Sequence, residues 1–284
     1  MNYRHVFHAG NFADVLKHCV LARLLTYMTG KDKPLRYIDT HAGIGRYDLS
    51  GDAAQRTGEA RDGLERLKAA LAGNAALAGL MEPYLSALKA ENAAHPGLYP
   101  GSPAIAARIL REQDRLILCE LHPEDHAVLS ANFARDRRVK TFASDGFSSL
   151  KAHLPPVERR GLVLIDPAFE ERNDLERSRK ALADGLRRFA GGVYVLWHRI
   201  KDRAETDAFY AGLAALVPGE CLALELHVDT IRADGPLSAC GLVIVNPPWG
   251  TRVECEALLP ALATALARGP GAHGVVRDLS RQDA

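Results

Sequence analysis

The amino-acid sequence predicts an α/β protein built on a doubly wound, mostly parallel sheet. Apolar runs of strand length recur along the chain, and amphipathic helical stretches separate several of them. Of the 284 residues, 47% are hydrophobic and 25% are charged, which suits a globular chain with a sizeable core. Alternating strands and helices form βαβ units, in which parallel strands are buried on both faces.

Seven runs are expected as strands because each is short, apolar and bounded by polar or turn residues. They are residues 35–40, 115–120, 139–145, 161–166, 193–198, 222–228 and 241–246. Helices are expected where apolar residues recur at helical spacing after the second, third and fourth strands. These helices are residues 122–136, 145–154 and 173–190.

Two intervals break the alternation of strands and helices. The first holds an Ala-, Leu-, Glu- and Arg-rich stretch, so residues 48–98 are expected as a helical insertion subdomain. Residues 1–47 and 99–284 would then form the main domain. The second interval, residues 229–240, is short and lacks an apolar helical stripe, whereas a parallel crossover needs a dozen residues or more. The last two strands are therefore expected to form a long hairpin, with the seventh strand antiparallel.

Composition excludes several classes of protein. No apolar run reaches the roughly 18 residues of a membrane span, and the first residues lack the apolar core of a signal peptide, so we expect a cytoplasmic protein. The net charge of +1 gives no bulk signal for nucleic acid, although basic pairs such as Arg137–Arg138 allow a local positive face. The five cysteines show no CxxC spacing, which predicts reduced, mostly buried thiols and neither a zinc site nor disulfides.

Each of the first four predicted strands ends on or beside an acidic residue. These four acids are Asp39, Glu120, Asp145 and Asp166. Ligands of open parallel sheets bind beyond the carboxyl ends of the strands, where these side chains would meet. Capping of the following helix would explain one or two of them. Four together indicate a polar ligand with hydroxyl and amine groups.

The segment after the first strand, DTHAGIGRYD, narrows the class of ligand. Gly43 and Gly45 allow close approach of the backbone, but Asp48 stands where a dinucleotide fingerprint has its third glycine, and the Lys-Ser/Thr pair of a P-loop is absent. A nucleotide-like ligand without a diphosphate fits better. S-adenosylmethionine is such a ligand: Glu120 suits its ribose hydroxyls and Asp145 its adenine amine. A nicotinamide-dependent dehydrogenase is the weaker alternative.

The stretch LIDPAFEE at the end of the fourth strand suits methylation of an exocyclic base amine. The side chain of Asp166 and the carbonyl of Pro167 can both accept hydrogen bonds from the amine and aim its lone pair at the methyl donor. Phe169 can stack on a base that has left its helix. The reaction is then an in-line displacement that depends on positioning and requires no metal.

A rival motif, Asn246-Pro247-Pro248-Trp249, has similar chemistry but a different expected position. If the seventh strand is antiparallel, Asn246 lies at the opposite edge of the sheet from the four acids. We therefore expect this motif to be a rigid strand exit with a packed tryptophan.

Several motifs together resemble the bacterial ribosomal RNA large subunit methyltransferase J family of class I S-adenosylmethionine-dependent enzymes. They are YRHVFHAGNFADVLKH (3–18), DTHAGIGRYDL (39–49), YPGSP (99–103), REQDRLILCELHP (111–123), ASDGF (143–147), LPPVERRGLVLIDPAFE (154–170) and VNPPW (245–249). The resemblance covers essentially the whole chain. It implies a Rossmann-like sheet of seven strands with the last antiparallel, and methylation of N6 of one adenine in 23S rRNA.

The resemblance also implies roles for individual residues. Cofactor contacts are implied at His18, His41, Ser102, Glu120, Asp145, Gly146 and Asp166. Asp166 would be the catalytic residue, Tyr3 would engage the RNA or the target base, and the segment with His5 and Lys17 would border the site. The partner would be 23S rRNA, naked or in an early assembly intermediate, and we expect a monomer without a metal or a membrane partner.

The catalytic corner departs from the family pattern, which is DPPY. Here it reads Asp166-Pro167-Ala168-Phe169, so Phe169 lacks the tyrosine hydroxyl but keeps a ring that can stack. Ala168 removes a ring that would restrict Pro167 to extended geometry, which predicts a somewhat looser corner. This departure is also the support for the alternative hypothesis, a non-catalytic RNA- or cofactor-binding protein of the same fold.

Overall fold

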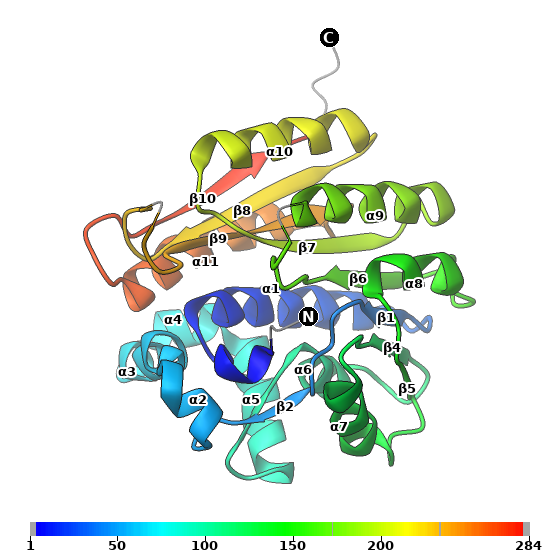
Figure 1. The fold of residues 1–284 in the computed structure, drawn as a ribbon, viewed down its shortest axis with the longest axis horizontal. Helices are drawn as coiled ribbons and strands as arrows, with labels where there is room; N and C mark the ends of the chain where they lie inside the picture. The colour runs from blue at the N-terminus through cyan, green and yellow to red at the C-terminus, as the bar shows by residue number, and fades with distance from the viewer. Residues whose placement is uncertain (1–3, 172, 233, 281–284) are drawn as a thin grey trace.

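The computed structural model describes residues 4–171, 173–232 and 234–280, and an eight-stranded sheet forms the centre of this part of the chain (Figure 1). The order of strands across the sheet is β10-β8-β9-β7-β6-β1-β4-β5. Their bounds are β1 Arg36–Asp39, β4 Arg115–Cys119, β5 Val139–Phe142, β6 Gly161–Ile165, β7 Val193–Arg199, β8 Cys221–His227, β9 Ala239–Val245 and β10 His273–Asp278.

The polarity of the strands confirms the predicted Rossmann-like sheet, which is parallel except for the last of the predicted strands. β5, β4, β1, β6 and β7 pair in parallel, whereas β9 runs antiparallel to both β7 and β8. β8 and β9 thus form the expected hairpin. The edge strand β10, which pairs antiparallel with β8, is additional to the seven predicted strands. Its sequence, HGVVRD, has only a short apolar centre and its residues stay partly exposed, so it lacks the long apolar run of the other strands.

Helices cover both faces of the sheet, and successive residues of each central strand point to opposite cores. In β6, Leu162 and Leu164 join one core, whereas Val163 and Ile165 join the other. The first core receives α1 Phe12–Thr29, α5 Glu82–Ala94, α6 Ser102–Ile109, α7 Pro123–Phe133 and α11 Thr251–Leu266. The second core receives α8 Gly146–His153, α9 Asp174–Arg188 and α10 Arg203–Leu216.

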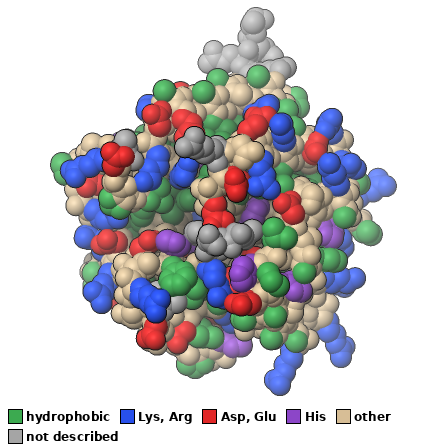
Figure 2. Space-filling model, in the orientation of Figure 1, with side chains coloured by type: hydrophobic (Ala, Val, Ile, Leu, Met, Phe, Trp, Pro, Cys, Tyr) green, Lys and Arg blue, Asp and Glu red, His purple; other side chains and the backbone are tan. Residues whose placement is uncertain are grey.

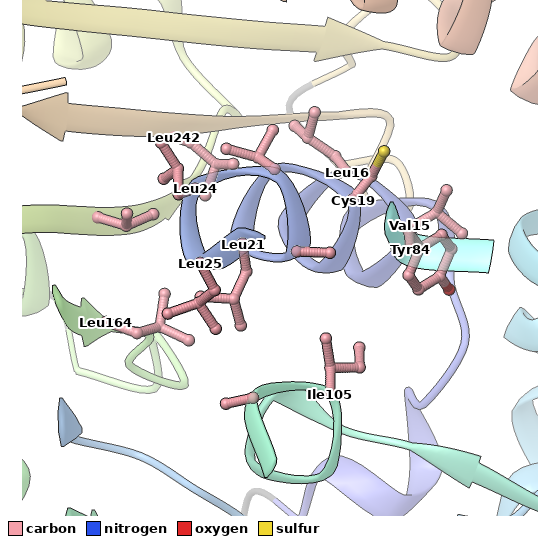
Figure 3. Packing of buried hydrophobic residues seen from close by; sticks show 14 of the residues in the cluster. Val15, Leu16, Cys19, Leu21, Leu24, Leu25, Tyr84, Ile105, Leu164 and Leu242 are labelled. Carbon is pink, nitrogen blue, oxygen red and sulfur yellow. The ribbon is translucent and has the colours of Figure 1, made fainter. Parts of the chain in front are cut away.

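Helix α1 lies in the middle of the first core, between the sheet and α6 (Figure 3). Its apolar residues point in all directions: Leu24 lies near Leu242 of β9, and Leu25 lies toward Leu164 of β6 (Figure 3). A helix that is apolar all round is one that is buried on all sides, and it shows no amphipathic stripe. The sequence therefore gives little periodic signal for α1, and no helix is predicted at its position.

The segment after β1 forms a helical excursion enclosed by a small two-stranded sheet. β2 (Arg46–Asp48) pairs antiparallel with β3 (Leu98–Pro100), and α2 Asp52–Thr57, η2 Arg61–Glu65, α3 Arg66–Leu71, α4 Ala75–Leu80 and α5 lie between them. Leu67, Met81 and Tyr84 are fully buried in the same core as α1. This segment thus shares the main hydrophobic core, and its status as a separate subdomain stays a prediction.

Two findings concern the membrane-spanning and cysteine-based classes that the composition argues against. None of the described helices is both long enough and apolar enough to span a bilayer. All five cysteines are buried and free, so they behave as the predicted core thiols.

Candidate active site

A cavity of about 590 Å³ opens at the carboxyl ends of β1, β4, β5 and β6. The register explains why the strand-end acids converge there: Asp39 pairs with Leu118 and Leu164, each of which precedes an acid by two residues. Figure 2 shows acidic, basic and histidine side chains gathered near the centre of this face. The predicted site residues that line the cavity are His5, Lys17, His18, His41, Ser102, Glu120, Asp145, Gly146, Asp166, Pro167 and Phe169. Tyr3 lies outside the described residues.

Glu120 is held rigidly at the cavity wall. Its two carboxylate oxygens accept hydrogen bonds from the backbone N–H groups of Gly43 and His122, at 2.9 Å and 2.8 Å. Burial raises the pKa of Glu120, although these two hydrogen bonds oppose that rise. A carboxylate oxygen has a second lone pair, so Glu120 can still accept hydrogen bonds from ligand hydroxyls.

Asp39 lies behind the cavity instead of lining it. Its side chain is fully buried, and one oxygen accepts hydrogen bonds from the hydroxyls of Tyr37 and Ser102, each at 2.7 Å. Burial raises the pKa of Asp39 to about 6. Ser102, which the sequence patterns do not single out, is thus oriented at the cavity wall by a strand-end acid.

Of the four strand-end acids, Asp145 is the one that caps a helix. Its side chain accepts a hydrogen bond from the backbone N–H of Ser148 in the first turn of α8, at 2.8 Å. Its other oxygen pairs with Arg177 at 3.1 Å, and the Arg177 guanidinium lies 4.6 Å from the centre of the Phe147 ring. The Phe147 ring and the Arg177 guanidinium therefore lie one over the other at the cavity lining beside Asp145. Arg177 is far from the other site residues in the sequence, so no local motif reveals it.

Gly146 brings two backbone segments into close contact at the start of α8. A Cβ atom at this position would lie 1.9 Å from the carbonyl oxygen of Thr40, a distance that no side chain tolerates. The chain can therefore pass close to the β1 loop, and the adjacent backbone stays accessible to a ligand. This is consistent with the cofactor contact that the family resemblance implies.

Lys17 connects α1 to the corner that follows β6. Its Nζ atom lies 2.6 Å from Oδ2 of Asp166 and 2.9 Å from Oδ1 of Asp14, and its side chain is almost fully buried. Burial alone would lower the pKa of Lys17, but the two carboxylates outweigh burial and raise it. Asp14 also accepts hydrogen bonds from the backbone N–H of Gly10 and, in the matching tautomer, from His5, each at 2.9 Å.

Asp14 is a site residue that sequence reasoning missed. Burial opposes its ionisation, but the contacts with His5 and Lys17 hold the pKa of Asp14 well below its usual range. A signal for it was present, because Asp14, Lys17 and His18 are spaced at i, i+3 and i+4 and therefore share one side of a helix. That signal has meaning only once α1 is known to be a helix.

The corner after β6 has a constrained backbone. Phe169 has a φ of +55°, in the left-handed region that a bulky residue rarely adopts. Two neighbours from β7 hold it: the Trp197 ring packs edge to face at 5.4 Å, and a guanidinium N–H of Arg199 donates to the Phe169 carbonyl at 3.2 Å. Such conformations persist where surrounding contacts impose them, and they cluster at functional sites. β7 thus braces the corner in which the second proline is absent.

Replacing Ala168 with proline tests how much stiffness the corner still lacks. We expect turnover to rise about twofold, because proline restricts the preceding residue to extended geometry and so fixes its carbonyl in advance. The check is the single-turnover rate of methyl transfer at saturating cofactor. Unchanged or lower turnover would mean that the bracing from β7 already supplies the stiffness.

The rival motif lies away from the cavity, as predicted. Val245 at the end of β9 pairs with Tyr194 near the start of β7, so Asn246 lies at the opposite edge of the sheet. Its side-chain amide donates to the carbonyls of Ala190 and Gly192, each at 2.7 Å, and therefore supports a loop. The expectation of a packed tryptophan is wrong: Trp249 is 87% exposed, because the turn into α11 carries it away from the sheet.

Three histidines with lowered pKa values couple the fold to pH. Burial lowers the pKa of His18 to about 3, and burial also lowers the pKa values of His41 and His198 to about 4. The unfolded chain binds protons at these positions below about pH 6.5, whereas the folded protein does not. Their contribution to stability is therefore complete above pH 6.5 and is lost as the pH falls. Asp39 opposes this trend. Because its pKa is raised, the folded protein takes up a proton at Asp39 at a higher pH than the unfolded chain does, which favours the folded state as the pH falls.

Replacing His198 with glutamine isolates one of these contributions, because His198 does not line the cavity. Between pH 7.5 and 5.5 the free energy of unfolding of the wild type should fall, and in His198→Gln it should fall by about 1.4 kcal/mol less. Urea unfolding at the two pH values measures the difference. Equal pH dependence in the two proteins would contradict a neutral, buried His198.

The chain is similar over most of its length to proteins of one family. The model of a family described as "Ribosomal RNA large subunit methyltransferase D, RlmJ" matches residues 32–277. The chain is 40% identical over 277 residues to ribosomal RNA large subunit methyltransferase J of Escherichia coli K12, which covers 97% of this chain and 98% of that protein. It is 41% identical over 268 residues to the protein of the same name from Haemophilus influenzae, with 94% of each chain covered.

A solved structure shows the same fold. A crystal structure of a protein from Legionella pneumophila str. Philadelphia 1 superposes with a TM-score of 0.85 at 35% sequence identity. The match covers 95% of this chain and 98% of the Legionella chain. The shared architecture thus extends over the sheet, the helical excursion and the helices on both faces.

Proposed function

The chain belongs to the RlmJ family of ribosomal RNA large subunit methyltransferases, and from this premise we propose its substrate and its mechanism. We propose that it methylates the N6 amine of one adenine in 23S rRNA, with S-adenosylmethionine as methyl donor. The observation that carries the proposal is that Asp166, Pro167 and Phe169 share one cavity with Glu120 and Asp145. Acceptors for a base amine and acceptors for a nucleoside thus lie at the same strand ends.

The cavity residues fit this cofactor in size and in chemistry. A volume of about 590 Å³ lies within the range of small-molecule sites. Glu120 is placed to accept from ribose hydroxyls, Asp145 from an adenine amine, and Phe147 with Arg177 to flank the adenine ring. His41, His18, Ser102 and Gly146 complete the wall on this side. S-adenosylmethionine, when bound, supplies an electrophilic methyl group.

Asp166 is proposed to orient the amine of the target base. Its Oδ2 atom pairs with Lys17, whereas Oδ1 has no hydrogen-bond partner within residues 4–171, 173–232 and 234–280. Oδ1 is therefore available to accept from the amine, and the Pro167 carbonyl provides the second acceptor. These acceptors hold the amine lone pair in line with the methyl group, so catalysis depends on preorganised positions. The 2.6 Å contact with Lys17 fixes the Asp166 side chain in place.

Phe169 is proposed to stack on the target base. Its ring lines the cavity but is only 6% exposed, so one edge or face is open at most before a base enters. Stacking on an aromatic ring stabilises a base that has left its helix by about 1–3 kcal/mol. Tyr3, His5 and Lys17 are proposed to lie on the RNA side of the site. We keep a cytoplasmic location and a monomer as predictions.

Mass spectrometry of 23S rRNA fragments tests this function. RNA from cells that lack the gene should carry one fragment that is lighter by a single methyl group, and the purified protein should restore that mass in vitro. An unchanged fragment mass in the deletion strain would refute the proposal. Cofactor binding without methyl transfer to deproteinised rRNA would favour the alternative, a non-catalytic binding protein of the same fold.

A further inference from the structure

The cavity has a second arm that the cofactor-directed residues do not occupy. Beyond Asp166 the lining continues through Trp197 and Arg199 of β7 and Lys201 just after it, and it is closed by Pro236 and Leu237 from the connection between β8 and β9. The pairing of Ile165 with Leu196 places Trp197 next to Asp166 across the sheet. The arm therefore begins at the catalytic corner and extends away from Glu120 and Asp145.

The cations of the two arms differ in how they are neutralised. Outside the second arm, Lys17 pairs with Asp14 and Asp166, and Arg177 pairs with Asp145 and Asp174. On the second arm, Arg199 and Lys201 instead donate to backbone carbonyls, those of Phe169 at 3.2 Å and Gly235 at 2.6 Å. Within the described parts of the chain, neither forms an ion pair with a carboxylate.

This difference has an electrostatic consequence. A carbonyl partner fixes the position of a cation without cancelling its charge, so Arg199 and Lys201 can each attract an anion. Glu170 and Glu171 also line the cavity, but neither forms an ion pair with these two cations among the described residues. In addition, the Nε–H of Arg199 is buried and has no hydrogen-bond partner among the described residues. A buried donor without a partner costs free energy unless a ligand or water satisfies it.

We propose that Arg199 and Lys201 bind a backbone phosphate of the RNA strand that carries the target base. This inference rests on the proposed function, because it assigns the nucleotide next to the flipped adenine to the second arm. Arg199 also connects phosphate binding with stacking of the target base. Since it holds the Phe169 carbonyl, a phosphate bound by Arg199 is placed in a fixed relation to the ring on which the base would stack.

The salt dependence of RNA binding tests this assignment. Each phosphate contact contributes about 0.7–0.9 to the slope of log K against log salt concentration. Lys201→Met should therefore reduce the slope for unmethylated 23S rRNA by about 1 and weaken binding severalfold at moderate salt. Lys201→Arg, which keeps the charge, should retain the slope. Calorimetry should show unchanged S-adenosylmethionine binding in both variants.

Lys140→Met is the matched control, because Lys140 is an exposed lysine of β5 that does not line the cavity. It should leave the slope at the wild-type value. Arg199→Lys and Arg199→Gln repeat the comparison at the second cation, where lysine should keep the slope and glutamine should lower it by about 1. This second pair keeps the test valid if Lys201→Met does not fold.

The outcomes separate the two proposals. If the wild type methylates 23S rRNA but Lys201→Met and Arg199→Gln keep its slope, the phosphate site is refuted and the function stands. If the wild type neither binds nor methylates 23S rRNA, both are refuted. A loss of slope in Lys140→Met equal to that in Lys201→Met would also overturn the assignment, because the contribution would then be nonspecific.

Discussion

Replacing Asp166 with alanine should lower the rate of methyl transfer by on the order of 10³-fold. The substitution removes the side-chain acceptor for the target amine and leaves only the Pro167 carbonyl to orient the lone pair. The defect should appear in the single-turnover rate at saturating RNA and cofactor, measured with a labelled methyl group. Cofactor binding should be retained or modestly weakened, because Glu120 and Asp145 stay in place.

A charge-matched control for this variant lies in the same cavity. Glu171 is an exposed acid at the cavity lining, so Glu171→Ala removes one negative charge without touching the corner. Its rate should stay within a few-fold of the wild type. A rate for Asp166→Ala within tenfold of the wild type would show that amine orientation does not depend on this carboxylate.

Replacing Lys17 with methionine should destabilise the protein as well as inactivate it. Asp14 and Asp166 both depend on this cation, and Asp14 is 1% exposed. Removing one partner of a buried ion pair leaves an uncompensated charge, which costs about 3–5 kcal/mol in the free energy of unfolding. Chemical unfolding of the wild type and of Lys17→Met at pH 7.5 measures this loss.

A double variant separates the structural effect of Lys17 from its catalytic effect. Adding Asp14→Asn to Lys17→Met removes one of the two uncompensated carboxylates, so part of the lost stability should return. Turnover should not return, because Asp166 still lacks the cation that fixes it. A loss of less than about 1 kcal/mol in Lys17→Met, or recovery of turnover in the double variant, would contradict the proposed role of Lys17.

The fold could be predicted from the sequence where the signal is local. The central strands are continuous apolar runs, and a short connection before β9 suffices to infer its antiparallel direction. α1 and β10 escaped prediction for opposite reasons. α1 is buried on almost all sides and so shows no amphipathic stripe, whereas β10 is an edge strand with only a short apolar centre.

The candidate site was predictable where acids end strands, since the geometry of a parallel sheet brings such residues together. Glu120, Asp145 and Asp166 follow from that rule, and Ser102 and His18 came only from the family resemblance. Arg177, Trp197 and Arg199 could not be inferred from local patterns, because they reach the cavity from α9 and β7 through tertiary packing. Trp249 shows that a local pattern can also mislead, because an aromatic residue after a strand is not necessarily packed.

The buried position of α1 has a consequence for how the protein is made. α1 is synthesised before β9 and α11, yet it packs against both of them. Contacts between such distant segments form late in folding, because the intervening chain must first be ordered. The contact of Lys17 with Asp166 is also made between distant segments, so this part of the site cannot form before the residues after β6 have been translated. We therefore expect fragments truncated before β9 to lack both a stable core and a competent site.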